Sequence, residues 1–250
     1  MTDTIDDGRK AAQGKKGFFG AHPRFLETSH TAVNRRRLNL RHRAIIETNS
    51  DILQGARVLD MASHDGRWSF AALKAGARHV VGIEAREDLV DNAERTFAEY
   101  GVDRSSYRFI ASDLFAALAR EDFEVDVVLC LGFFYHTLRY PELLAGIRRH
   151  DPQYLIVDTT VIPSRKPVIK VAVNKAEYES HATADSFSHG SLTLVGVPSM
   201  PALELMLGVY DFEVERLSDW EALADEAGAA AIKVYAEGGR ITARCRRRST

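Results

Sequence analysis

The chain has 250 residues, which is enough for one large α/β domain or for one domain with an elaboration. A net charge of −2 gives no global electrostatic case for nucleic-acid binding, and 45% apolar and 27% charged residues are ordinary globular values. Two cysteines without a CxxC pair or a His/Cys cluster predict neither a disulfide framework nor a metal site. No apolar run approaches the roughly 20 residues of a membrane span or forms a signal-peptide core, so we expect a cytoplasmic protein without a membrane partner.

The N-terminal part is expected to consist of a tail and a helical region. Residues 1–17 are polar and rich in Gly and Lys, which is typical of a flexible tail. Residues 18–55 are expected to be mostly helical, and they contain the densest basic run, Arg35–Arg43. A charge run is usually a solvated helix face, but this one could also bind a phosphate or carboxylate. Arg41 and Arg43 are the preferred functional pair, because they lie toward the sheet end of the segment.

Strands and helices alternate through residues 56–162. The apolar run Val125–Leu131 is nearly continuous, as in a parallel strand covered on both faces. This repeated order with short connections predicts a doubly wound, mostly parallel sheet. The expected strands are Arg57–Ala62, His79–Ala85, Tyr107–Ser112, Val125–Leu131 and Tyr154–Thr159. The helices are expected to follow at Trp68–Ala75, Glu87–Tyr100, Phe115–Arg120 and Pro141–Arg149.

The alternation stops after Ile162. Residues 163–200 contain three prolines and no clean period, so we expect an insertion that covers or shapes a substrate site. Residues 201–250 then return to regular elements, with a helix at Pro201–Val209 and strands at Phe212–Leu217 and Arg240–Arg246. The whole of residues 18–250 is therefore expected to form one α/β domain with seven strands.

Small residues follow the first strand, and an acid ends the second. Asp60 is followed by a turn in which Ala62, Ser63 and Gly66 let the backbone approach a ligand closely. Glu84 can accept hydrogen bonds from both hydroxyls of a ribose. These features predict an adenosine-containing ligand.

The same turn does not suit a dinucleotide. A pyrophosphate-binding turn has the pattern Gly-x-Gly-x-x-Gly, which is absent here. His64, Asp65 and Trp68 are too bulky for it, and Asp65 would repel a pyrophosphate. Trp68 could equally be core packing or the wall of a ligand's tail.

The motif order resembles that of the Rossmann-like (class I) methyltransferases that use S-adenosylmethionine (SAM), roughly over residues 55–160. That family's first motif reads apolar-apolar-Asp-x-Gly-x-Gly-x-Gly, and here Ala62 and His64 replace the first two glycines of Val58–Gly66. Glu84 matches the family's ribose-binding acid. Ser112-Asp113-Leu114 matches the segment at the adenine, and Leu131–His136 the segment that borders cofactor and substrate.

The resemblance implies SAM as cofactor and a set of residues that contact it. Asp113 could also simply cap the following helix, and Asp60 could cap the turn. The expected contacts are Asp60, Ala62, Ser63, Gly66, Trp68, Glu84, Ala85, Asp113, Leu114, Leu131, Gly132 and Arg43.

Two segments are similar to the subgroup that contains the transfer-RNA wobble-uridine carboxymethyltransferases. They are Gly132–His136, and Val195–Glu204 leading into Phe212–Glu215. Those enzymes hold a carboxylated SAM with an arginine shortly before the Val-Pro-Ser element. Ser188–Leu194 contains no arginine, so ordinary SAM is the expected cofactor.

Several polar residues could act on the acceptor. His136 and Tyr135 follow the fourth strand, where active-site residues of open α/β sheets gather. His136 could be a general base for a hydroxyl, because the ordinary pKa of histidine suits proton removal near neutral pH, or it could be a satisfied structural histidine. Asp158, His181 and His189 are further candidates.

These observations predict methyl transfer to a small molecule, with an oxygen as the first choice of acceptor atom. The low net charge and the aromatic run Phe133-Phe134-Tyr135 favour this partner. One alternative is an RNA-modifying methyltransferase. Another is an NAD-dependent reductase or a non-catalytic nucleotide-binding protein. The acceptor itself and the oligomeric state are not indicated by the sequence.

Overall fold

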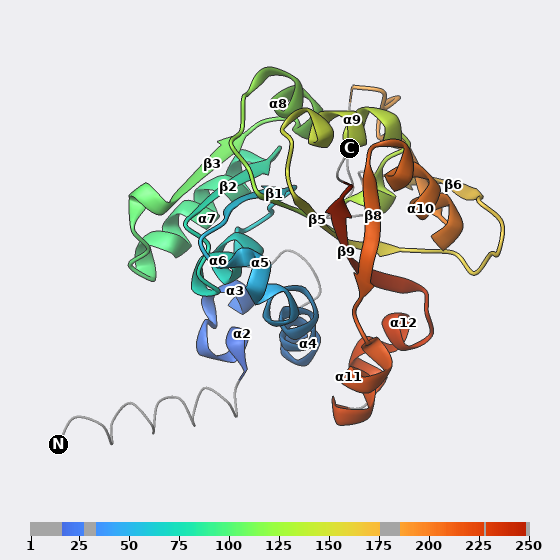
Figure 1. Cartoon of the computed structure of the whole chain (residues 1–250). Coiled ribbons are helices and arrows are strands. Elements are labelled where there is room, and N and C mark those ends of the chain that lie inside the picture. The colour runs from blue at the N-terminus through green and yellow to red at the C-terminus, as the bar shows by residue number, and fades with distance from the viewer. Residues whose placement is uncertain (1–16, 28–33, 176–185, 228, 249–250) are drawn as a thin grey trace.

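The computed structural model describes residues 17–27, 34–175, 186–227 and 229–248. Its centre is a seven-stranded sheet in the order β3-β2-β1-β4-β5-β9-β8, in which β1 to β5 run parallel (Figure 1). β9 is antiparallel to both of its neighbours, β5 and β8. The predicted doubly wound, mostly parallel fold is confirmed. The strands are β1 (Arg57–Met61), β2 (His79–Glu84), β3 (Tyr107–Ala111), β4 (Val127–Leu131), β5 (Tyr154–Thr160), β8 (Phe212–Leu217) and β9 (Arg240–Arg247).

Helices cover the sheet on both faces because the central strands are apolar on both sides. Along β4, Val128 and Cys130 face one core, and Val127 and Leu129 face the other. The first core lies under α8 (Leu114–Arg120), α9 (Tyr140–Arg149) and α10 (Met200–Val209). The second lies under α6 (Arg67–Lys74), α7 (Glu87–Glu99) and the N-terminal helices. Figure 1 shows α8 and α9 above the sheet and α4 to α6 below it.

The region before β1 is helical, as predicted. It comprises α2 (Phe18–Ala21), α3 (Arg24–Glu27), α4 (Arg35–Ile45), the 3-10 turn η1 (Glu47–Asn49) and α5 (Ser50–Leu53). Phe19 and Phe25 are fully buried against the aromatic rings of α6. The expected tail at residues 1–17 lies, but for Gly17, outside the described residues.

The segment expected as an irregular insertion contains two strands. β6 (Ile169–Lys175) and β7 (Leu192–Pro198) pair antiparallel as a separate two-stranded sheet. The prolines around them concealed this pairing in the sequence. The hydroxyl of Tyr140 donates to the carbonyl of Gly196 at 2.5 Å, and the amide of Gly196 donates to the carbonyl of Thr137 at 3.2 Å. The β6–β7 sheet is therefore fixed to the segment that follows β4.

Two C-terminal helices between β8 and β9 were not predicted. These are α11 (Trp220–Ala227) and α12 (Lys233–Ala236), the latter preceded by the 3-10 turn η4 (Ala229–Ile232). Trp220 and Tyr235 stack on one another and bury their rings against Leu40 and Ala44 of α4. This third apolar cluster ties α4 to the helices between β8 and β9. Within the described parts of the chain, no helix has both the length and the apolar character that crossing a bilayer requires.

Candidate active site

The sheet has its topological switch point between β1 and β4. From β1 the chain proceeds to β2 on one side, while β4 lies on the other. Ligands of open α/β sheets bind outside the carboxyl ends of the strands at such a point. The turn after β1, the end of β2 and the segment after β4 all lie at the carboxyl ends of the strands. We call this end of the sheet its edge, and the candidate site is built from these three segments.

The turn after β1 has the backbone of a glycine-rich loop with only one glycine. Ala62, His64 and Gly66 have φ angles of 52°, 54° and 73°, in the left-handed region that glycine favours. These are the three positions at which the family motif has glycine. Gly66 also has no room for a side chain, because a Cβ there would lie 2.7 Å from the Phe109 ring. The turn therefore keeps the conformation that brings backbone close to a ligand, at the cost of strain in Ala62 and His64.

Glu84 ends β2 beside this turn and is almost fully buried. Its Oε2 accepts the backbone N–H of His64 at 2.9 Å, and its Oε1 accepts that of Arg86 at 3.1 Å. The carboxylate is thus held against the turn by two backbone donors. Each oxygen retains a further lone pair that can accept a ribose hydroxyl.

Asp60 lies in the core beneath the turn. It is 1% exposed, and its Oδ2 accepts the Ser69 hydroxyl at 2.6 Å, which joins β1 to α6. Burial raises the pKa of Asp60 to about 7, against the lowering effect of Ser69. The described contact of Asp60 is with Ser69, and its expected contact with a cofactor remains a prediction.

From the sequence, Asp65 was expected to repel a pyrophosphate, but in the structure its charge is paired. It is completely buried, and the Arg67 guanidinium donates to it at 2.7 and 2.5 Å. Burial alone would raise the pKa of Asp65, but Arg67 outweighs it and lowers the pKa to about 2. The charge is therefore neutralised by a partner two residues away. His64 Nδ1 lies 3.5 Å from the same carboxylate.

Of the predicted arginine pair, Arg41 reaches the sheet edge. Its guanidinium lies over the Trp68 ring, 4.9 Å from the centroid, and donates to Asp158 at 3.1 Å. Arg43 lies near Glu47 and lowers the pKa of that carboxyl, after the larger effect of His42. The expected contact of Arg43 with the cofactor stays a prediction, while Arg41 is the member of the pair whose contacts lie at the ends of the strands. Trp68 is buried between Arg41 and Phe19, which favours its structural role.

Asp158 is a structural ion-pair centre and not a free base. It is fully buried at the end of β5 and accepts hydrogen bonds from Arg41, Tyr235, Arg240 and Thr242. Burial would raise the pKa of Asp158, but Arg240 and Arg41 outweigh it and lower the pKa to about 2. The described contacts of Asp158 are therefore structural, and its catalytic role stays a prediction.

The segment after β4 brings Tyr135 and His136 to the edge in the 3-10 turn η3 (Phe134–His136). The Tyr135 hydroxyl accepts from Arg240 Nη1 at 3.2 Å, and the two rings of Tyr135 and His136 lie 4.2 Å apart. Nδ1 of His136 lies 2.9 Å from Nδ2 of Asn174 on β6. Gly132, with φ of 89°, begins the turn.

Neighbouring aromatic residues do not form the expected wall of the site. Phe133 and Phe134 are buried in the core under α8 and α9. Phe134 stacks on Tyr140 with centroids 4.9 Å apart. Of the run, Tyr135 alone is half-exposed, so it is the aromatic residue that could contact an acceptor.

The remaining predicted site residues lie partly at the carboxyl ends of the strands and partly away from them. Asp113 caps α8 by accepting the amide of Ala116 at 2.8 Å, and Leu114 is buried behind it. Ser63 is buried in the turn, Ala85 is exposed after β2, and Leu131 ends β4. His189 lies in the turn before β7, where its backbone pairs with Leu192, so its predicted catalytic role is not supported. His181 lies outside the described residues.

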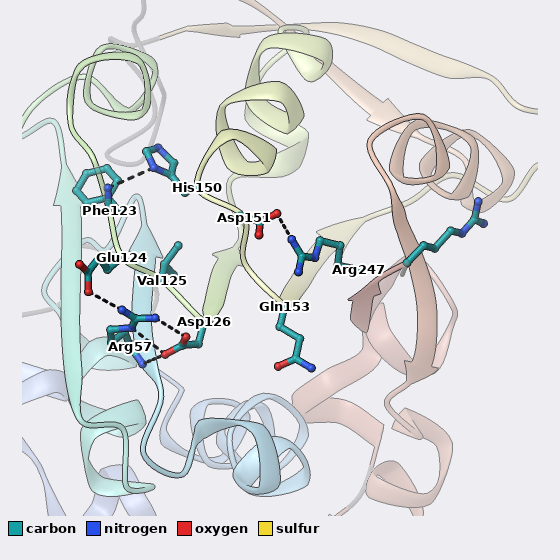
Figure 2. A pocket seen from close by; sticks show the side chains of 10 residues that line it. Arg57, Phe123, Glu124, Val125, Asp126, His150, Asp151, Gln153 and Arg247 are labelled. Atoms are coloured by element: carbon teal, nitrogen blue, oxygen red, sulfur yellow. Dashed lines mark hydrogen bonds and ion pairs between the residues drawn. The ribbon is translucent and has the colours of Figure 1, made fainter. Parts of the chain in front are cut away.

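A separate cavity of about 640 Å³ lies at the opposite edge of the sheet (Figure 2). It is at the amino ends of β1, β4 and β5. Arg57 pairs there with Asp126 and Glu124, and Arg247 pairs with Asp151. Because these charges are matched with each other and the cavity is at the wrong edge for the motifs, we do not place the active site there.

Comparison with known proteins decides the class of the site. Residues 58–150, from β1 to the end of α9, match the family model described as a methyltransferase domain. These residues form a class I methyltransferase domain. SAM is its cofactor. No curated protein sequence matches the chain.

Solved structures agree on the fold of the methyltransferase. Magnesium protoporphyrin IX methyltransferase from Synechocystis PCC 6803 with bound SAM is 17% identical with a TM-score of 0.54, over 91% of this chain and 95% of that one. A candidate RNA methyltransferase from Pyrococcus horikoshii is 13% identical with a TM-score of 0.53, over 89% of each chain. A [4+2]-cyclase is 15% identical with a TM-score of 0.59, over 89% of this chain and 86% of that one. The different reactions in these names show that the fold does not determine the acceptor.

The residues at the methyltransferase's edge fit a phosphate-free adenosine cofactor. The left-handed turn exposes backbone close to the ligand, and Glu84 is already aimed across it. Ser63 Oγ is buried and has no hydrogen-bond partner within the described residues, which leaves a polar atom in the same turn. Glu84 would hold the ribose, and the segment around Asp113 the adenine.

Two residues were not predicted from the sequence. Arg240 donates to Asp158, as Arg41 does, and Asn174 contacts His136. Arg240 opens the last strand and Asn174 sits in a strand that was not predicted. The only signal for Arg240 was its place directly after the Gly238-Gly239 turn. Asn174 carried none, because its partner His136 is 38 residues away in the sequence.

Proposed function

We propose that this methyltransferase transfers the methyl group of SAM to an oxygen atom of a small molecule. The observation that carries the proposal is the juxtaposition of two sites at the ends of neighbouring strands. The cofactor turn follows β1, and the polar pair Tyr135–His136 follows β4 beside the β6–β7 sheet. An acceptor held by the polar pair would lie next to the cofactor.

Methyl transfer from SAM requires little of the protein beyond alignment of the acceptor with the methyl group. SAM supplies a methyl group already activated on a sulfonium. The residues of the chain therefore have to orient the acceptor oxygen and exclude water. The Tyr135 hydroxyl, which accepts from Arg240, retains its own proton to donate to the acceptor. The β6–β7 sheet, fixed to the segment after β4, covers the acceptor side.

A small acceptor is favoured by how the basic run is used. Arg41 is committed to Asp158, and Arg37 lies over the Tyr235 ring at 5.9 Å. Arg35 and Arg36 are exposed. Two exposed arginines give a weaker phosphate-binding surface than the run in the sequence indicates.

RNA modification is the second candidate. It is supported by the resemblance to the transfer-RNA wobble-uridine carboxymethyltransferases and by the exposed pair Arg35 and Arg36. Its test is retention of the protein on RNA at low salt. A steep fall of affinity with rising salt would favour RNA, because phosphate contacts release counterions. Arg35→Gln with Arg36→Gln would then reduce the salt slope.

The experiment that tests the proposed function is calorimetric titration of the full chain. SAM, S-adenosylhomocysteine (SAH), carboxy-SAM and NAD are compared. We expect micromolar binding of SAM and SAH and no binding of NAD. Preference for carboxy-SAM would support the RNA-modifying subgroup. Binding of NAD in place of SAM would contradict the proposal and support a reductase.

A further inference from the structure

The hydrogen bond between Asn174 and His136 fixes which nitrogen of the histidine carries a proton. Nδ2 of Asn174 is an amide N–H group, which can only donate. The atom 2.9 Å away, His136 Nδ1, must therefore accept, and in a neutral imidazole the proton is then on Nε2. His136 is 8% exposed, and its ring packs against Tyr135. This packing holds the ring in its orientation.

A histidine in this tautomer is a hydrogen-bond donor at Nε2 and not a proton acceptor. The nitrogen that could take a proton is the one that Asn174 occupies. The adjacent Tyr135 hydroxyl accepts from Arg240 and so also presents a proton. The polar pair after β4 therefore consists of two donors.

The carboxylates near the edge do not replace the missing base. Asp158 receives donors from four residues. The two oxygens of Glu84 accept the backbone N–H groups of His64 in the cofactor turn and of Arg86 after β2. Asp60 lies in the core on Ser69. Among these described residues, the acids are held by other partners, and Tyr135 and His136 are the groups with a proton to donate.

We propose, building on the proposed function, that Asn174 is a positioning residue that holds His136 as the Nε2–H donor, and that the acceptor is a carboxylate. A carboxylate is already deprotonated at neutral pH, so no base is required. Its oxygen lone pair forms the new C–O bond as the C–S bond of the methyl group breaks. The bonding electron pair stays on sulfur, SAH leaves as a neutral sulfide, and a methyl ester forms without proton transfer. Two donors are the groups that would orient a carboxylate.

The first test reads the tautomer directly. The full chain, labelled with ¹⁵N in histidine and saturated with SAH, is studied by NMR at neutral pH, with the His136 signals identified by their loss in His136→Gln. We expect the proton on Nε2. Asn174→Asp should move it to Nδ1, because a carboxylate accepts, and Asn174→Leu should give a mixture of tautomers. Val173→Asp is the control, since it places the same charge on the exposed neighbour in β6 and should leave His136 unchanged.

A proton on Nδ1 in the unaltered protein, a doubly protonated ring, or an Asn174→Asp protein with the proton still on Nε2 would each overturn the positioning role. If an Asn174 variant does not fold, the unaltered spectrum alone decides. The tautomer is also read without SAH, and calorimetry on the same samples reports SAM binding. Failure of the proposed function, in which SAM does not bind, is thereby distinguished from failure of the tautomer.

The second test addresses the class of acceptor. Benzoate and benzyl alcohol, which share a ring and differ in the reacting group, are titrated into the SAH-bound chain. We expect benzoate to shift the His136 Nε2–H signal and Tyr135→Phe to weaken this binding several-fold. An equal or stronger response to benzyl alcohol, or no response to either probe, would overturn the carboxylate assignment.

Discussion

The cofactor turn shows that backbone conformation, and not glycine itself, is the feature that the methyltransferase retains. Ala62 and His64 adopt φ angles of 52° and 54° beside Gly66. A left-handed conformation costs a non-glycine residue about 1–2 kcal/mol. The hydrogen bond from the His64 N–H to Glu84 on one side and the Asp65–Arg67 ion pair on the other hold the strained turn in place.

Ala62→Gly should therefore stabilise the protein, by roughly 0.5–1 kcal/mol, because relief of strain exceeds the added entropy of the unfolded chain. Ala71→Gly is the matched control. It lies inside α6, is fully buried, and should cost about 1 kcal/mol or more. Chemical denaturation measures both. An equal loss in the two variants would show that Ala62 is not strained.

Glu84→Ala should weaken SAM binding by roughly 2–4 kcal/mol, because it removes two hydrogen bonds to a charged acceptor. Glu84→Gln keeps an oxygen for the backbone N–H of His64 or Arg86, so it separates ribose binding from support of the turn. Glu87→Ala, an exposed acid at the start of α7, is the control. Calorimetry with SAM gives the result, and unchanged affinity in a folded Glu84→Ala protein would contradict the ribose role.

At the scale of elements, one carboxylate joins four segments of the chain. Asp158 on β5 receives Arg41 from α4, Tyr235 from α12, and Arg240 and Thr242 from β9. The apolar cluster of Trp220, Tyr235 and α4 residues lies beside it. The N-terminal helices and the C-terminal strands are thus held together at the edge of the sheet where the candidate site lies.

Asp158→Ala should destabilise the protein by about 3–5 kcal/mol, because it leaves the guanidinium groups of buried Arg240 and half-buried Arg41 without their counter-ion. Thr242→Val removes one neutral donor from the same centre and should cost about 1 kcal/mol. Thermal and urea unfolding compare the two. Similar small losses in both variants would show that the ion pairs contribute little.

At the scale of the whole molecule, buried acids with opposite pKa shifts shape the dependence of stability on pH. The pKa values of Asp65 and Asp158 are lowered to about 2, so their contribution is present above about pH 4 and is lost as pH falls toward 2. The pKa of Asp60 is raised to about 7, so the folded state retains a proton that the unfolded chain releases. Stability from this group therefore falls as pH rises from about 4 to about 7.

Asp60→Asn should remove that fall. Relative to the unaltered protein, the variant should gain up to about 4 kcal/mol between about pH 4.5 and pH 8, since roughly three pKa units correspond to that free energy. The amide oxygen of the substituted side chain can still accept the Ser69 hydroxyl. Urea unfolding across this pH range is the measurement. Parallel pH profiles of the two proteins would show that Asp60 ionises normally in the folded state.

The alternation of strands and helices from β1 to α9 and the nature of the cofactor were indicated by the sequence, because both depend on local signals. Apolar runs such as Val127–Leu131 are typical of buried strands when turns and amphipathic helices flank them, and the small residues and the acid at strand ends lie within short motifs of the chain. Leu89, Ala93 and Phe97 are spaced as one face of a helix, and they likewise form the buried face of α7.

Which polar residues face the acceptor was decided only by the tertiary structure. Asp158 is a plausible base in the sequence, yet donors from residues 41, 235, 240 and 242 occupy it. Nδ1 of His136 lies 2.9 Å from Nδ2 of Asn174, in a strand that local pattern did not reveal. The charge and hydrogen-bonding state of a buried group depend on partners that are distant along the chain, and only folding brings them within hydrogen-bonding distance of one another.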